Sequence, residues 1–330
     1  MRRAVLIYNS ASGQHFNHRN GVIDDALAVL RRAGVQAEAV ATTAPGTAGA
    51  LAEESVRQGC DTVIACGGDG TIHEIMQSLV GGQAALGVIP LGTANALAMD
   101  LGLPLSPAKA AGMLLTATPV RIPVGHIFYR DGGGATHSRY FTVAAGIGAD
   151  AQLMYRLDAK LKRQFGYALY AVEGLRVLAT HTFPTFEAVF TTRGSHKPRV
   201  EEVSQLLAVR IKDFGGMLHH FAPGAALENH TLRLVAFKTR NRFDYLRFLL
   251  AVVFRRQTFH SRIELLDADS VECRARKGSI TRVYVEADGE SLGEVPVKIE
   301  IVPGALTLLV PPRVTQLKAA PRRSRQVAIS

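Results

Sequence analysis

A glycine-rich segment, Cys66-Gly67-Gly68-Asp69-Gly70-Thr71, constrains the fold more than any other part of the chain. It follows the apolar run 62–65 and precedes residues 72–79, in which apolar side chains recur at helical spacing. A buried strand, a glycine turn and a helix start are typical of a loop that binds phosphate through backbone N–H groups. The glycines remove the Cβ atoms that would keep a polyphosphate from those groups. A plain strand-to-helix turn is the alternative for this segment alone.

Two further strand ends carry similar turns. The run 86–90 leads into Leu91-Gly92-Thr93-Ala94-Asn95, and the first run, 4–8, leads into Asn9-Ser10-Ala11-Ser12-Gly13. The carboxyl ends of parallel strands meet at one edge of a sheet, where open α/β sheets bind their ligands. Three such loops together predict a nucleotide site. Asp69 is poorly suited to bind an anion directly, so we expect it to hold a metal-bound water or a hydroxyl group.

The rest of the chain divides near residue 120. Before this point strands alternate with helices, which predicts a doubly wound, mostly parallel α/β sheet. The expected strands there are 4–8, 35–41, 62–65 and 86–90, and the expected helices are 21–33, 47–58, 71–80, 94–101 and 107–116. Beyond it, short runs predict a β-rich antiparallel sandwich or barrel. The expected strands are 126–129, 140–145, 186–190, 205–211, 232–237, 261–266, 283–286 and 297–302, and the expected helices are 152–178 and 243–256.

Composition agrees with a two-domain enzyme of the cytoplasm. A length of 330 residues with 47% hydrophobic residues suits two cores, expected over 1–120 and 121–304 with a nucleotide site in the cleft between them. The three cysteines have no metal-ligand spacing, which suits a reducing compartment. The start of the chain does not read as a signal peptide, and the longest apolar run, 249–254, is far too short to span a bilayer.

The motifs resemble a known family. The strings GGDGTIHEIMQSL and LGVIPLGTANALAMDLGLP are similar to the catalytic domain of the diacylglycerol kinase and sphingosine kinase superfamily, and the whole chain to its soluble bacterial lipid kinases. The resemblance runs from the first strand to about Pro312 and includes residues 146–150, 160–167 and 287–290. The GGDGT string is shared with NAD kinases, whereas Asp288-Gly289-Glu290 is more specific to the lipid kinases. No Walker-type Gly-Lys-Ser/Thr string occurs.

The resemblance implies transfer of the ATP γ-phosphate, with Mg²⁺, to a hydroxyl of a diacylglycerol-like lipid. Asp288 would be the catalytic base, and Glu290 would orient it or a metal-bound water. Asp69 would reach the metal through water. The last strand, 305–312, would return to the first domain. From spacing alone, Asp288-Gly289 reads as a hairpin turn. The expected nucleotide-binding residues are Asn9, Ser12, Gly13, Thr43, Gly67, Gly68, Asp69, Gly70, Thr71, Glu74, Gly92, Thr93 and Asn95.

Two departures concern an auxiliary Mg²⁺ site. The family's bacterial diacylglycerol kinases carry two further aspartates for a structural Mg²⁺, where this chain has Pro123 and Asn229. Proline cannot ligate a cation through its side chain, and asparagine is a weaker, neutral ligand for a hard metal. We therefore expect this auxiliary site to be absent or rebuilt.

The net charge of +10 fits an anionic partner, with ordinary surface solubilisation as the alternative that covers much of it. Transient contact with an anionic membrane explains it better than nucleic acid, because no nucleic-acid-binding motif accompanies the charge. We expect a cytoplasmic protein, peripheral at the inner membrane surface, with a disordered basic tail over 317–330 and homodimer formation left open. Helix 243–256 reads as a cover for the β-rich core, with membrane docking as the alternative. An NAD kinase-like enzyme and an inactive lipid-binding regulator remain the rival functions.

Overall fold

The structure is a computed structural model. It describes residues 1–9, 16–131, 133–156, 173–174, 176–195, 197–214, 221–254, 262–276, 278 and 281–312. The predicted tail over 317–330, the motif 160–167, and Ser12 and Gly13 of the first loop lie outside these residues. None of the helices in the described part of the chain is both long and apolar enough to cross a membrane.

The N-terminal part is a parallel sheet with the strand order β4-β3-β1-β2. Its strands are β1 (Arg3–Asn9), β2 (Gln36–Thr42), β3 (Thr62–Gly67) and β4 (Ala85–Pro90). Its helices are α1 (Phe16–Arg32), α2 (Ala48–Arg57), α3 (Asp69–Leu79), α4 (Ala96–Asp100) and α5 (Pro107–Leu115). Every expected element of this part is present, which confirms the α/β assignment.

Alternating side chains of the strands bury both faces of this sheet. Val5 and Ile7 of β1 pack in one cluster with α2, α3 and α4, whereas Ala4 and Leu6 pack in another with α1 and α5. Successive side chains of a strand point to opposite faces, so a strand covered on both sides must be apolar throughout. This requirement explains the near-continuous apolar runs from which the strands are predicted.

The C-terminal part is antiparallel and follows the path β12-β11-β10-β7-β14-β15, with the remaining strands paired beside it. Its inward side chains form one core, to which β7, β8, β10, β11 and β13 contribute. Helices α6 and α8 lie on the outer side of β10 and β11. The strands are β5 (Thr118–Arg130), β6 (Thr136–Phe141), β7 (Ala144–Gly148), β8 (Phe186–Thr191), β9 (Arg199–Val203), β10 (Gln205–Val209), β11 (Leu232–Phe237), β12 (Ile263–Ala268), β13 (Ser270–Ala275), β14 (Tyr284–Ala287) and β15 (Glu290–Val310), and the helices are α6 (Ala149–Arg156) and α8 (Arg242–Val253).

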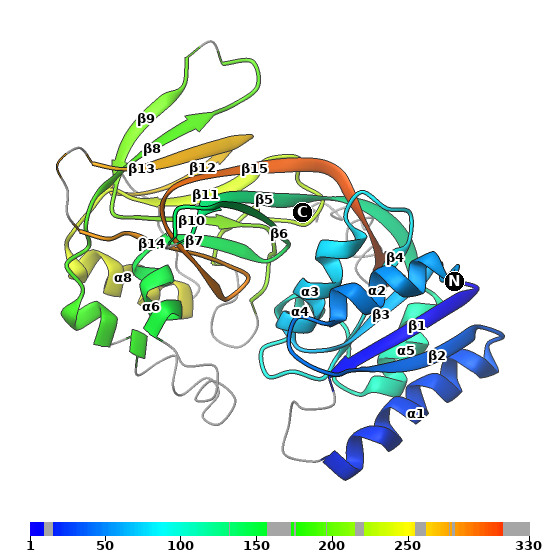
Figure 1. Cartoon of the computed structure of the whole chain (residues 1–330). Helices are drawn as coiled ribbons and strands as arrows, with labels where there is room; N and C mark the ends of the chain where they lie inside the picture. Colours follow the sequence, from blue (N-terminus) through cyan, green and yellow to red (C-terminus); the bar gives the residue numbers. More distant parts are fainter. Residues whose placement is uncertain are drawn as a thin grey trace, which may run out of the picture.

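Strands β5 and β15 run side by side through both parts of the molecule (Figure 1). They pair from Glu294↔Arg130 in the β-rich part to Val310↔Thr118 in the α/β part, where β15 also pairs parallel to β4. The boundary expected at residue 120 therefore falls inside β5. The strands expected at 297–302 and from 305 onward are one strand, because a register shift between Val302 and Leu306 accommodates the intervening Pro303-Gly304.

The β-rich part differs from the predicted elements in four places. Strand β9 and strand β13 were not predicted, and the expected strand 140–145 is two strands, β6 and β7. The predicted helix 152–178 begins earlier, at Ala149, and residues 157–172 lie outside the description. Strands β9 and β13 escape prediction because charged and apolar residues mix along them and their side chains are partly exposed.

Candidate functional site

The two glycine loops of the α/β part touch each other. A Cβ atom on Gly92 would lie 2.3 Å from the Cα atom of Gly68, so position 92 requires glycine for the backbones to approach; a Cβ atom on Gly68 would lie 3.1 Å from the Cα atom of Gly92, a tight contact. The amide of Leu91 also donates to the carbonyl of Gly67 over 2.9 Å. The edge of the sheet expected to bind the nucleotide is thus assembled from β3 and β4, as their parallel pairing requires.

Each loop closes on itself through a small side chain. Asn95 adopts a left-handed φ of 52° and is buried; its amide group accepts from Gly92 N over 2.9 Å and donates to Gly92 O over 2.8 Å. A Cβ atom on Gly67 would lie 2.6 Å from Oγ1 of Thr71. Gly70 and Thr93 are exposed, and a Cβ atom on Gly70 would meet nothing within 4 Å. The exposed residues of the loops therefore lie next to residues whose positions are fixed by close contacts and hydrogen bonds.

Asp69 connects the two loops. It is the first residue of α3, and its Oδ1 accepts a hydrogen bond from Ala96 N over 2.8 Å. Burial raises the pKa of Asp69, and the charge of Asp288 raises it further. The carboxylate therefore has a local role, holding the start of α4, in addition to any contact it makes with a ligand.

The other expected nucleotide-binding residues are spread more widely. Asn9 lies half-buried at the end of β1, in register with Thr42, and Thr43 is exposed directly after β2. Glu74 accepts hydrogen bonds from the protein backbone: its Oε1 accepts from Gly46 N over 3.0 Å and its Oε2 from Ala48 N over 3.1 Å. In this arrangement Glu74 fixes the start of α2.

Asp288 and Gly289 form the two-residue turn between β14 and β15. Their φ angles are 47° and 81°, the positive values of a type I′ hairpin. The carboxylate of Asp288 folds back toward β7 and accepts from Thr142 N at 3.0 Å, Val143 N at 2.9 Å and Ala144 N at 3.1 Å. Its fourth contact is with the imidazole of His73 on α3. The turn expected from spacing and the proposed catalytic residue are thus the same feature.

The hydrogen bonds around His73 favour one tautomer. Gln77 Oε1 accepts from Tyr140 N over 2.9 Å, so the Gln77 amide nitrogen is the group facing His73 Nε2 at 3.3 Å. The amide NH₂ only donates: one hydrogen goes to Tyr140 O over 2.8 Å, and the other lies within reach of both His73 Nε2 and His73 O. This arrangement favours a proton on Nδ1, which would donate to Asp288 Oδ2 over 3.4 Å. The α/β part thus holds Asp288 of the β-rich part through the imidazole of His73.

A buried carboxyl pair lies behind this turn, and the sequence reasoning missed it. Asp150 on α6 and Glu286 on β14 hydrogen bond to each other, and Glu286 Oε2 accepts from Gly289 N over 2.9 Å. Burial raises the pKa of Asp150 to about 6 and raises that of Glu286, to which the charges of Asp150 and Asp288 add. Two carboxyl groups in such contact share a proton.

A glycine inside a strand is the signal that could have revealed this pair. Gly146 lies opposite Glu286 in the ladder between β7 and β14. A Cβ atom at Gly146 would lie 2.4 Å from Asp150 Oδ2 and 2.8 Å from Glu286 Oε1. An interior strand glycine marks such a close approach.

Glu290 does not make the contact with Asp288 that one of its two expected roles requires. It forms an ion pair with Arg139 of β6, and both side chains are partly exposed. The contacts that orient Asp288 come instead from the backbone of residues 142–144 and from His73. Glu286 anchors the turn through Gly289. Asp288 lies in the turn with a φ of 47°, whereas Glu290 is the first residue of β15, so closeness in sequence does not place the two side chains together.

The auxiliary Mg²⁺ site does not fit the residues present. The guanidinium of Arg210, 1% exposed, occupies the region between Pro123 and Asn229. It donates to four backbone carbonyls, those of Pro123, Leu227, Asn229 and Thr231, over 2.8–3.1 Å. Burial lowers the pKa of Arg210 to about 10, which leaves it charged at neutral pH. A fixed cation thus satisfies these oxygens, and the described residues hold no cluster of three His, Cys, Asp or Glu for a metal.

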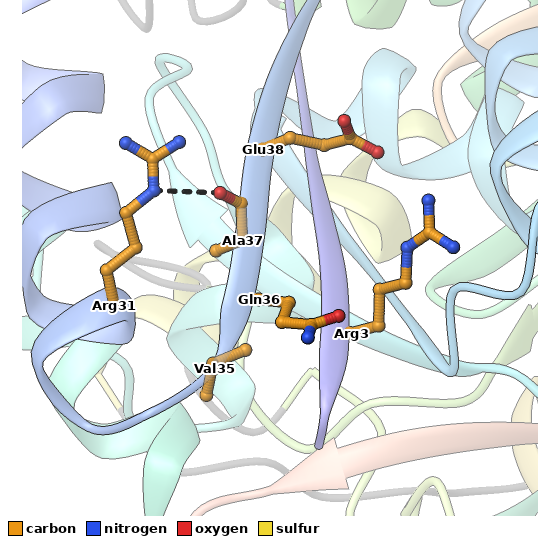
Figure 2. A pocket seen from close by; sticks show the side chains of 6 residues that line it. All are labelled: Arg3, Arg31, Val35, Gln36, Ala37 and Glu38. Atoms are coloured by element: carbon orange, nitrogen blue, oxygen red, sulfur yellow. Dashed lines mark hydrogen bonds between the residues drawn. The ribbon is translucent and has the colours of Figure 1, made fainter.

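The surface pocket in Figure 2 lies at the opposite edge of the parallel sheet. It is lined where β1 and β2 begin, far from the loops at their carboxyl ends, and Arg31 Nε donates there to Ala37 O over 2.9 Å. Its lining residues are Arg3, Arg31, Val35, Gln36, Ala37 and Glu38. We assign no function to this pocket.

Comparisons with known proteins identify the family. The model of the diacylglycerol kinase catalytic domain matches residues 3–127, and that of the YegS C-terminal NAD kinase beta sandwich-like domain matches residues 142–310. These matches define a kinase of the diacylglycerol kinase class. The chain belongs to the bacterial diacylglycerol kinase family, which confirms the resemblance seen in the motifs, and this membership implies that it uses ATP.

Individual relatives agree with this assignment. The diacylglycerol kinase of Staphylococcus saprophyticus is 27% identical over 298 residues, covering 89% of this chain and 91% of that protein. The diacylglycerol kinase of Bacillus subtilis is 27% identical over 299 residues, covering 90% and 92%.

Solved structures support the fold. A putative diacylglycerol kinase from Bacillus anthracis superposes with a TM-score of 0.74 at 23% identity, covering 94% of this chain and 98% of the other. Yeast NADH kinase, solved with NADH, gives a TM-score of 0.52 at 10% identity, covering 99% and 90%. At these identities the likeness concerns the fold alone.

Proposed function

We propose that this kinase transfers the γ-phosphate of ATP to a hydroxyl of a diacylglycerol-like lipid, giving a phosphatidate-like product. The observation that carries the proposal is the contact between His73 and Asp288. It joins α3, whose first residue is Asp69, to the hairpin of the β-rich part. A carboxylate suited to take a proton therefore lies beside loops suited to hold phosphates, which is the arrangement that phosphoryl transfer to an alcohol needs.

The glycine loops are proposed to hold the phosphates of ATP. Gly70 and Thr93, both exposed, offer backbone N–H groups, while Asn95 closes its own loop on Gly92 and Asp69 joins the two loops. We expect Mg²⁺ to arrive with ATP and to neutralise charge on the phosphates, because the described residues form no three-ligand cluster of their own. Asp69 would reach that ion through water.

Asp288 is proposed to accept the proton of the lipid hydroxyl. A carboxylate has about four acceptor sites, and three backbone N–H groups and His73 use them here. The His73 contact, at 3.4 Å, is the longest of the four and the one a hydroxyl can most readily replace. The proton would pass to Oδ2 as the acceptor oxygen bonds to the γ-phosphorus and ADP leaves.

The protein is proposed to act at the inner surface of the membrane, where such a lipid would be encountered.

Incubation of the purified protein with γ-labelled ATP, Mg²⁺, mixed membrane lipids and NAD tests the function directly. We expect one labelled lipid that migrates with phosphatidic acid when diacylglycerol is supplied, and none with an Asp288→Asn protein. Labelled NADP without labelled lipid would replace the proposal with the NAD kinase alternative. Absence of any transfer by a folded protein would favour the inactive regulator.

A further inference from the structure

Helix α8 is apolar on two opposite sides. Tyr245, Phe248 and Val252 are buried against β10 and β11, in a cluster that also includes Ala149 of α6. On the other side, Phe243 is 71% exposed and Phe254, at the end of the helix, is 68% exposed. The buried side alone suffices for the helix to cover the β-rich core, so the packing of this domain does not explain the outer apolar side chains.

The outer apolar residues form a continuous surface. Phe243, Leu250 and Phe254 are seven and then four residues apart, which places them on one side of a helix, opposite the buried residues. Leu249 and Val253, 41% and 40% exposed, widen this surface. Most other large exposed apolar residues of the described chain are scattered singly, which is normal for a soluble protein. A concentration on one helix marks an interaction site.

Positive charge borders this surface. Arg240, Arg242 and Arg247 are exposed before and along the helix. The only acidic residue of α8, Asp244, is buried, where it accepts from Thr239 over 2.7 Å and pairs with Arg262. The outer face of α8 therefore combines apolar side chains with cationic margins and presents no carboxylate of its own. This combination is typical of helices that lie in the interface of an anionic membrane.

We propose that the outer face of α8, formed by Phe243, Leu249, Leu250, Val253 and Phe254, docks the protein on an anionic lipid bilayer. A second copy of the chain fits less well, because a twofold contact through α8 would bring both sets of arginines together. The inference deepens the proposed function and rests on it in one respect: a lipid substrate is the reason why the enzyme would visit a bilayer. Membrane contact thus arises from a specific helix in addition to overall charge.

The absence of tryptophan from the chain permits a direct test. Leu250→Trp places a single tryptophan on the proposed surface, and Val200→Trp places one at an equally exposed apolar position on β9. Each protein is mixed, without ATP, with vesicles of phosphatidylglycerol or phosphatidylcholine that carry brominated acyl chains. We expect a blue shift and strong quenching for Leu250→Trp with phosphatidylglycerol only, and neither for Val200→Trp.

A second pair of variants tests the need for the surface. Phe243→Ser/Leu250→Ser should lose most sedimentation with phosphatidylglycerol vesicles, whereas Val200→Ser should keep it. If the Leu250→Trp protein sediments with the vesicles without being quenched, another surface makes the contact and the inference is wrong. A spectral shift that grows with protein concentration in the absence of vesicles, with a dimer mass, would assign the surface to a second copy and also overturn it.

These measurements are separate from the test of the kinase. Docking is observed without substrate, so a protein that inserts α8 but phosphorylates no lipid would refute the proposed function alone. A protein that phosphorylates lipid while α8 stays in water would refute the docking surface alone.

Discussion

The imidazole of His73 and the carboxylate of Asp288 lie 3.4 Å apart, although 215 residues separate them in the chain. One belongs to the first helix after the glycine loop and the other to a hairpin of the β-rich part. Both are nearly inaccessible to solvent. The contact joins a histidine of the α/β part to a carboxylate of the β-rich part that three backbone N–H groups also hold.

We predict that Gln77 controls this contact through the tautomer of His73. In ¹⁵N-histidine spectra, His73 should carry its proton on Nδ1 in the unaltered protein. Gln77→Glu places a carboxylate oxygen at Nε2, so the imidazole should become protonated on both nitrogens. His73→Leu should lower kcat by up to roughly 10²-fold through misplacement of Asp288, with KM for ATP little changed. Finding the proton on Nε2 in the unaltered protein would contradict the network.

Asp288→Asn should lower the rate of phosphoryl transfer by roughly 10²–10⁴-fold if Asp288 accepts the proton. The amide NH₂ would also face a backbone N–H that the carboxylate now satisfies, such as that of Thr142. A loss of about 1–3 kcal/mol in the free energy of unfolding is therefore expected as well. Thermal melts must accompany the kinetics, and a folded variant within a few-fold of the original rate would end the assignment of Asp288 as base.

Gly92→Ala should abolish ATP binding. Its Cβ atom would overlap the Cα atom of Gly68, so the two loops must separate. Gly70→Ala meets no protein atom within 4 Å and should fold normally, so any loss of ATP affinity in that variant reports contact with the nucleotide. Gly112→Ala, in open space on α5, is the control for both. Isothermal titration with ATP-Mg²⁺ measures the affinities; unchanged affinity in Gly92→Ala would remove the paired loops from the site.

Arg210 should replace any need for a structural Mg²⁺. The melting temperature of the protein should be the same in EDTA and in Mg²⁺. Arg210→Met should lower the free energy of unfolding by at least about 3 kcal/mol, because each buried carbonyl left without a donor costs about 1–3 kcal/mol. Arg276→Met, at a mostly exposed arginine, should change it little. Strong stabilisation of the unaltered protein by Mg²⁺ alone would show that a metal still binds structurally.

The carboxyl pair should make the protein less stable as pH rises. The pKa of Asp150 is about 6 in the folded protein, above its ordinary value, so its favourable contribution is complete below about pH 4 and is lost as pH rises through 6. Asp150→Asn mimics the protonated form and keeps a donor toward Glu286. The variant should therefore gain stability relative to the unaltered protein between pH 5 and pH 8, measured by urea unfolding. A constant difference over this range would exclude a shared proton.

The α/β half of the fold could be predicted from sequence because each of its strands is covered on both faces. Such strands are continuous apolar runs, as at Thr62–Gly67 and Ala85–Pro90, and glycine turns mark their ends. The β-rich half was less predictable. Arg199 in β9 pairs with Glu201 and Glu264, so charged residues stabilise a partly exposed strand that has no apolar alternation.

The candidate site was predictable only where it depends on local sequence. The glycine loops and the Asp288-Gly289 turn are encoded by neighbouring residues. Partners that come from distant segments, such as His73 with Asp288 and Arg210 with Pro123, were not identified from the sequence. These contacts depend on the order of the strands in space, which no single sequence motif predicts.

The paired strands β5 and β15 carry the only two crossings between the parts in the described chain, and Val124 and Val302 lie opposite each other at that point. The β-rich part is therefore topologically an insertion into the α/β part, to which the paired strands β5 and β15 connect it. Its ends are already adjacent, so joining them costs little loop entropy. The hairpin that carries Asp288 and helix α8 could thus be exchanged between relatives as one cassette, while the α/β part keeps its own strand order.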